Sequence, residues 1–136
     1  MSYLLDTCVI SELVKRTPEY PVVKWLDDTP EELKFVSVIS LAEIKFGIIS
    51  APEGQKRDRL EAWFERLLRP SFADRVVAFD EAVSMRWATL KKKYKNAPVL
   101  DSQIAASAVE HAMTLVTRNV KDFSFAGLKV FNPWQR

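Results

Sequence analysis

Four acidic residues carry most of the chemistry that this sequence offers. Asp6 closes a short apolar run, Glu43 lies early in a helical segment, Asp101 begins an alanine-rich helical segment, and Asp122 follows a second apolar run. The chain has one histidine, His111, and three glycines, which excludes a two-imidazole mechanism, a P-loop and a G-x-G-x-x-G fingerprint. No G-x-S-x-G elbow occurs either. The catalytic side chains that remain are carboxylates.

Each acid, taken alone, also has a structural explanation. Asp6 could cap the helix that follows it. Ser40 and Glu43 have the spacing of a capping box, in which the Glu43 carboxylate would accept a hydrogen bond from the Ser40 backbone amide. Asp101 at a helix start is favoured by the helix dipole. Asp122 could bind the backbone of its own loop. Their combination therefore matters more than any single acid.

Short strands alternate with helices along the chain, and these elements must position the acids. Apolar runs predict strands at residues 2–6, 34–37, 75–79, 114–117 and 128–131. Helical spacing predicts helices at residues 7–16, 21–28, 41–50, 55–68, 80–94 and 100–113. This alternation indicates an α/β fold in which helices cover a parallel sheet.

The predicted fold brings the four acids to one edge of the sheet. Right-handed crossovers place the carboxyl ends of parallel strands on one edge, where open α/β sheets bind ligands. Carboxylates that converge there raise one another's pKa values unless a cation intervenes. Mg²⁺ or Mn²⁺ would relieve the repulsion, because hard cations bind carboxylate and water oxygens and bridge to phosphate. The chemistry so indicated is metal-activated water attacking a phosphodiester.

The composition is that of a globular protein, and we expect one domain spanning residues 1–136. Hydrophobic residues make up 48% and charged residues 28%, which separates the chain from disordered sequences. The net charge of +2 is too small to indicate a nucleic-acid partner by itself. The single cysteine, Cys8, excludes an intrachain disulfide. The start lacks the basic residues of a signal peptide, and no uncharged stretch reaches the roughly 18 residues of a membrane span. We therefore expect no membrane association and a cytoplasmic location.

Four segments resemble a known family. Residues 3–13, YLLDTCVISEL, resemble the opening of a PIN domain, specifically of the VapC/FitB-like toxins of type II toxin–antitoxin pairs. Residues 40–48, SLAEIKFGI, resemble the second acidic motif of that family. Residues 101–108, DSQIAASA, and residues 115–123, LVTRNVKDF, resemble the third and fourth motifs, which are the most specific. The resemblance covers nearly the whole chain, in the right order.

The resemblance implies a three-layer α/β/α sandwich with a five-stranded, mostly parallel sheet. It also implies an Mg²⁺- or Mn²⁺-dependent endoribonuclease, a toxin whose acidic pocket is blocked by a cognate antitoxin, and a homodimer. By position, Asp6 and Asp101 match the family's most consistent metal ligands, and Glu43 and Asp122 complete the acidic set. The polar residues that match positions supporting the acids are Thr7, Thr117 and Asn119.

Other interpretations of the acids remain open. They could belong to a PIN-type nuclease of RNA processing or to a structure-specific DNA nuclease, although the small size of the chain argues against both. They could grip basic residues of a partner in a non-catalytic binding module. A receiver-type phosphoacceptor domain also gathers acids at strand ends, but it needs an acid pair after its first strand, and here Asp6 stands alone.

Two basic clusters could steer an RNA backbone towards the acids. One comprises Lys91, Lys92, Lys93 and Lys95, and the other comprises Lys56, Arg57 and Arg59. Charge runs of this kind also form ordinary solvated helix faces. Arg86 and Arg118 are closer in sequence to the acids and are further candidates for contact with phosphate.

The remaining conspicuous side chains are expected to pack rather than react. His111 is expected at the carboxyl end of its helix, about three turns beyond Asp101. Phe46 and Ile49 could belong either to the core or to a dimer face. The residues expected to serve packing are Cys8, Trp63, Phe64 and Trp87.

Overall fold

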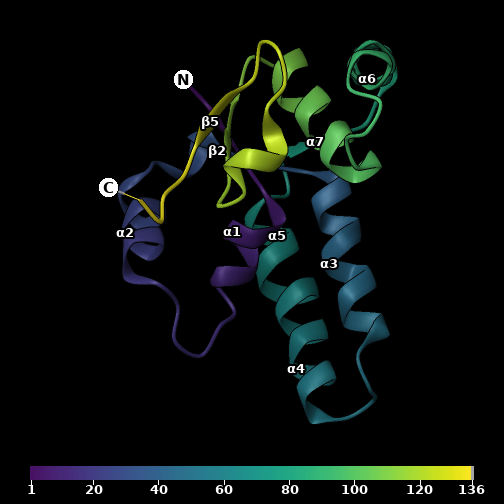
Figure 1. Cartoon of the computed structure of the whole chain (residues 1–136). Coiled ribbons are helices and arrows are strands. Elements are labelled where there is room, and N and C mark those ends of the chain that lie inside the picture. Colours follow the sequence, from purple (N-terminus) through teal and green to yellow (C-terminus); the bar gives the residue numbers. More distant parts are fainter. Residues whose placement is uncertain (136) are drawn as a thin grey trace.

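A five-stranded parallel sheet forms the centre of the computed structural model, which describes residues 1–135 (Figure 1). Its strands are β1 (Tyr3–Leu5), β2 (Lys34–Ser37), β3 (Val76–Val77), β4 (Thr114–Val116) and β5 (Lys129–Phe131). They lie in the order β3-β2-β1-β4-β5, and every neighbouring pair is parallel. The main helices are α1 (Thr7–Glu12), α2 (Tyr20–Asp28), α3 (Val38–Ser50), α4 (Gln55–Trp63), α6 (Glu81–Lys93) and α7 (Val99–Glu110).

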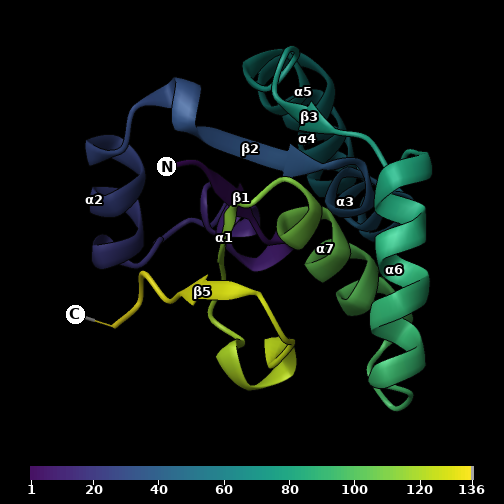
Figure 2. The same cartoon turned by 90° about the horizontal axis from the view of Figure 1, so that it is seen from above.

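Side chains alternate along β1 and so divide the core between the two faces of the sheet. Leu5 belongs to the cluster on the face covered by α1, α2, α3 and α4. Leu4 belongs to the cluster on the other face, where α7 packs with three buried residues. Figure 2 shows α7 lying between the sheet and α6. The predicted α/β/α sandwich is confirmed.

The strand order reverses direction between β1 and β4. From β1 the chain proceeds to β2 and β3 on one side, whereas β4 and β5 lie on the other side. Such a switch point opens a crevice at the carboxyl ends of the strands, where ligands bind. Leu5 and Val116 pair in register, and the Asp6 amide donates to the Val116 carbonyl at 2.9 Å. Asp6 and Thr117 are therefore the first residues beyond the sheet at this point.

Two helices differ from their predicted bounds, and the second difference changes the position of Glu43 within its helix. The predicted helix at residues 7–16 ends at Glu12, whose buried carboxylate turns inward to accept from the Glu19 amide at 2.7 Å. Pro18 also disfavours helical backbone at the residue before it. The predicted helix at residues 41–50 begins at Val38, because Ser37 caps it directly after β2. Glu43 consequently lies in the second helical turn.

Two further segments are more broken than the sequence indicated. The predicted strand at residues 75–79 shrinks to β3, because its partner β2 ends at Ser37 and turns into α3. The predicted helix at residues 55–68 consists of α4 followed by a π-helical turn, η2 (Phe64–Leu68). It then continues beyond its predicted end as the short α5 (Arg69–Ser71). The π turn shifts the helical phase. As a result Leu68 is buried, while the neighbouring Leu67 is exposed.

No helix within residues 1–135 is long and apolar enough to span a membrane.

Candidate active site at the switch point

Asp6 is the most enclosed acid of the site, with 6% of its surface exposed. It follows β1 and serves as the N-cap of α1, where its Oδ1 accepts from the Thr7 amide at 2.8 Å. Its Oδ2 accepts from the Thr117 hydroxyl at 2.8 Å and faces the Cys8 thiol at 3.6 Å. Asp6 therefore both caps α1 and belongs to the candidate site. A buried carboxylate needs such donors, because burial without them is costly.

Thr117 joins the two sides of the switch point. It follows β4 and is fully buried, so its hydroxyl has a fixed position. The Oγ1 atom donates to Asp6 and accepts from the Asn119 amide at 3.0 Å. Thr117 therefore orients one acid and shapes the loop that leads to Asp122. Asn119 takes part through its backbone, and a supporting role for its side chain stays a prediction.

Glu43 faces α1 rather than the start of its own helix. The predicted capping box is wrong, since Ser37 is the N-cap of α3 and accepts from the Ile39 amide at 3.0 Å. Glu43 Oε1 instead accepts from the Thr7 hydroxyl at 2.8 Å. Burial raises the pKa of Glu43, the Thr7 hydrogen bond opposes that rise, and the nearby Asp6 charge adds to it. The helix that carries Glu43 is therefore tied to the helix that begins at Asp6.

The pKa of Asp101 is affected by the charges of the other three acids. Asp101 lies in the first turn of α7, half-buried, and no side chain caps this helix. Its pKa is raised to about 6, first by burial and then by the negative charges of Asp6, Asp122 and Glu43. Asp122 contributes from the 3₁₀ helix η3 (Val120–Phe123), where it is exposed. The four predicted acids thus come from four separate parts of the chain, and three of them act electrostatically on Asp101.

The donor set suits a hard divalent cation, because it consists of carboxylate oxygens. Among residues 1–135, however, no three acidic, histidine or cysteine side chains lie close enough to form a ready metal site. Asp6 and Glu43 instead accept hydrogen bonds from threonine hydroxyls. The fit to Mg²⁺ or Mn²⁺ is therefore one of chemistry and charge, without a preformed coordination shell.

Cys8 belongs to the site, which the sequence did not indicate. It packs against the core cluster that contains Leu5, as expected. Its sulfur also lies 3.6 Å from both Asp6 Oδ2 and Thr117 Oγ1 and accepts from the Arg118 amide at 3.5 Å. Burial raises the pKa of the Cys8 thiol, so the group is a neutral donor to Asp6. Its place two residues after the acid, in the first turn of α1, was the one available signal.

Other candidates from the sequence fall outside the acidic site. Arg86 pairs with Glu110 at 3.1 Å. Glu110 is the last residue of α7, whereas Asp101 lies in its first turn, so the two acids are about 14 Å apart along the helix. His111 is the exposed C-cap of α7, as predicted. Trp87 packs between α6 and α7 and donates to Ser102 Oγ at 2.9 Å, which confirms a packing role.

The remaining packing predictions concern α3, α4 and η2, on the face of the sheet that Leu5 faces. Phe64 is buried in the cluster that covers Leu5, and Trp63 packs against it, as expected. Phe46 and Ile49 are exposed, which removes the core interpretation for both. A dimer face that includes them stays a prediction.

The comparisons with known proteins agree with this geometry. A family model described as "PIN domain" matches residues 3–126. Toxin FitB of Neisseria gonorrhoeae is 38% identical over 135 residues, covering 96% of this chain and 97% of the relative. The VapC ribonuclease Y4jK of Sinorhizobium fredii is 37% identical over 136 residues, covering 97% of each chain.

Solved structures give the same result. A chain in the crystal structure of FitAcB from Neisseria gonorrhoeae has a TM-score of 0.90 at 36% identity, with 98% of this chain and 99% of that chain covered. A chain in a toxin–antitoxin complex from Klebsiella pneumoniae has a TM-score of 0.72 at 26% identity, with 97% and 98% covered. The resemblance seen in the four sequence motifs is confirmed, and the chain belongs to the PIN-domain family.

Proposed function

We propose that this protein is a metal-dependent endoribonuclease that acts as the toxin of a toxin–antitoxin pair. The observation that carries the proposal is the meeting of Asp6 and Glu43 at the switch point, where Thr117 and Thr7 hold their carboxylates. Asp101 and Asp122 add to it, since the charges of Asp6, Asp122 and Glu43 help to raise the pKa of Asp101. Carboxylates that repel one another favour a cation between them. The relatives named as a ribonuclease and as a toxin support RNA as the substrate.

The proposed roles of the acids follow the resemblance to the PIN-domain family, and those of the threonines follow from their contacts. Asp6 and Asp101 would hold Mg²⁺ or Mn²⁺, and Glu43 and Asp122 would complete the acidic set. A cation bound there supplies a water of lowered pKa and positive charge for the developing phosphorane-like transition state. Thr117 holds Asp6 through its hydroxyl, and Thr7 does the same for Glu43. Asp101 is ionised at neutral pH, because its raised pKa of about 6 is still below 7.

The proposed partners follow the family. A cognate antitoxin would inhibit the enzyme by covering the acidic site, in line with the toxin–antitoxin complex among the structural neighbours. A homodimer and a cytoplasmic location are further parts of the proposal. The competing interpretation, a binding module without catalysis, differs in one measurable respect, since it requires no RNA cleavage.

Cleavage of total cellular RNA by the purified protein tests the proposal. We expect discrete fragments with Mg²⁺ or Mn²⁺ and none with EDTA, seen on a denaturing gel. Asp101→Asn should lower the rate at least about 100-fold, since loss of an outer-shell partner already costs 10–100-fold. Glu43→Gln can still accept from Thr7, so a similar loss in this variant would show that the charge matters. Cleavage that survives Asp101→Asn would place the active site elsewhere.

The raised pKa of Asp101 predicts a pH dependence of stability. The folded chain holds this proton more tightly than the unfolded chain, where the pKa is about 4. The associated stability is therefore present below about pH 4 and is lost as the pH rises through about 6. Urea unfolding in EDTA, followed across this range, should show a larger loss in the natural protein than in Asp101→Asn, where the raised pKa of Glu43 leaves a smaller loss. Parallel pH profiles of the two proteins would contradict the electrostatic coupling.

The Thr117 hydroxyl is predicted to be a positioning group. Thr117→Val keeps the shape of the side chain but removes the donor to Asp6, and should lower metal affinity or activity by about 10–100-fold. Thr117→Ser keeps the hydroxyl and should retain most of both. Titration of Mn²⁺ by calorimetry, beside the cleavage assay, separates metal binding from turnover. Equal behaviour of the valine and serine variants would argue against this role.

A further inference from the structure

Two cavities share Asp122 in their linings. One, of about 510 Å³, is lined by Arg118, Asn119, Lys121 and Asp122 together with residues near the carboxyl terminus. The other, of about 420 Å³, is lined by Lys93, Lys95, Lys121 and Asp122 among others. Lys121 and Asp122 belong to both linings, so the two cavities adjoin each other at η3. We call them the Arg118 cavity and the Lys93 cavity.

The two cavities are basic although they adjoin an acidic site. Asp122 is the one acid that lines them, against four cationic side chains. Among the ion pairs within residues 1–135, none involves Arg118, Lys121, Lys93 or Lys95. Arg118 acts at longer range on the buried Glu12 carboxylate, whose pKa its charge helps to lower. Within the described residues the four cations make no close ion pair, so their charges are available to an external anion.

The walls of both cavities are held by specific contacts. Lys91 Nζ donates to the carbonyls of Lys95 and Ala97 at 2.8 and 2.7 Å, which fixes the loop between α6 and α7. The Tyr94 hydroxyl accepts from the Ala126 amide at 2.8 Å and ties this loop to the segment after η3. On the other side, the Arg118 guanidinium lies over the Trp134 ring, 5.1 Å from its centre. The cations thus project from ordered elements.

We propose that a single RNA strand crosses η3 at Asp122, with its backbone phosphates on the two sides of the cleaved bond seated in the Arg118 and Lys93 cavities. This inference rests on the proposed ribonuclease function and adds the path of the substrate. An acidic site repels a polyanion, and flanking cations offset that repulsion close to where the cation-binding carboxylates lie. Single-stranded RNA suits the arrangement, because a basic groove that tracks the backbone binds it without need of a duplex.

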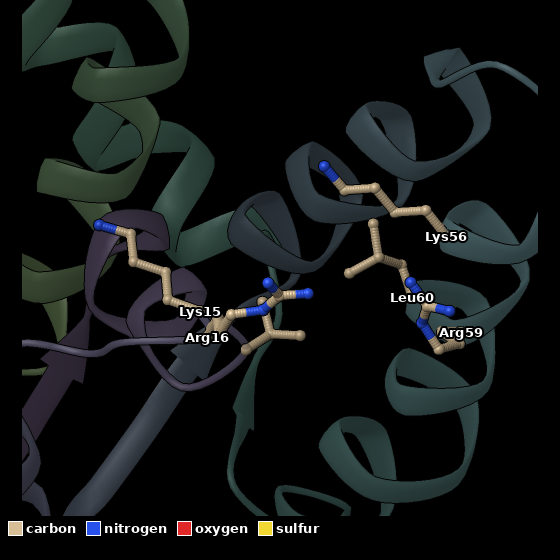
Figure 3. Close-up of a pocket in the computed structure, with 6 residues that line it drawn as sticks. Lys15, Arg16, Lys56, Arg59 and Leu60 are labelled. Carbon is tan, nitrogen blue, oxygen red and sulfur yellow. The ribbon is translucent and has the colours of Figure 1, made fainter.

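A larger basic cavity elsewhere provides a matched control. It has a volume of about 830 Å³ and includes Lys15, Arg16, Lys56 and Arg59 in its lining. Figure 3 shows Lys15 and Arg16 on one wall and Lys56, Arg59 and Leu60 on the other. It lies beyond the carboxyl end of α1, whereas Asp6 lies at the amino end, and none of the four acids lines it. Its charge is similar, but its lining shares no residue with the Arg118 and Lys93 cavities.

Binding of a short fluorescein-labelled single-stranded RNA tests the path without any cleavage. The measurements use Asp101→Asn protein in EDTA, over a series of salt concentrations, by fluorescence anisotropy. Arg118→Gln and the pair Lys93→Gln with Lys95→Gln should each weaken binding and reduce the slope of log Kd against log salt by about 0.7 per lost phosphate contact. Arg118→Lys keeps the charge and should retain the slope. The control pair Arg16→Gln with Arg59→Gln should leave it unchanged.

The outcomes separate this inference from the proposed function. A slope that falls only in the control pair, or in none of the variants, overturns the proposed path. A slope that falls as expected supports the path even if the natural protein with Mn²⁺ does not cleave total cellular RNA, a result that would instead defeat the nuclease proposal. Where hydrolysis occurs, the cavity variants should raise KM and leave kcat nearly constant, because they bind phosphates away from the bond that breaks.

Discussion

The hydrogen bond from Thr117 to Asp6 is the contact on which the site depends. The bond is 2.8 Å long and joins the residue after β4 to the residue after β1. These are the two strands between which the order of the strands reverses. A hydrogen bond to a buried charged group contributes about 1.5–3 kcal/mol, so this one both stabilises the Asp6 carboxylate and fixes the separation of the two loops. Thr7 extends the arrangement, since its amide binds Asp6 and its hydroxyl binds Glu43. Helix α3 is thereby attached to the same point.

The acids that surround this contact oppose the stability of the fold. Burial and three neighbouring negative charges raise the pKa of Asp101, so its ionised form is disfavoured in the folded chain. In the proposed function a cation removes that penalty and the same charges become its ligands. The substrate is also an anion, so it must be attracted despite the acids. The basic cavities beside Asp122 supply that attraction. Repulsion at the centre and attraction at the rim would together set where the RNA backbone lies.

The sequence predicted the sheet, its helical layers and the four acids, because strand and helix periodicities are local and parallel strands bring their carboxyl ends together. It did not predict how the acids are held. Ser37 and Ser40 both have the character of a helix cap, and only the end of β2 decides in favour of Ser37, which leaves Glu43 free to face Thr7. The role of Cys8 was equally hidden, since its contacts with Thr117 and Arg118 connect residues more than 100 positions apart. Lys93 and Lys95 belonged to a predicted basic cluster, but their place beside Asp122 depends on the loop that Lys91 fixes.

Anomalous diffraction from crystals soaked in Mn²⁺ tests the central claim, that the carboxylates at the switch point form a cation site. The account predicts a peak between the carboxylates of Asp6 and Asp101 that disappears in Asp101→Asn crystals soaked in the same way. No peak there at saturating Mn²⁺, or a peak bound by other residues while this site stays empty, would contradict it.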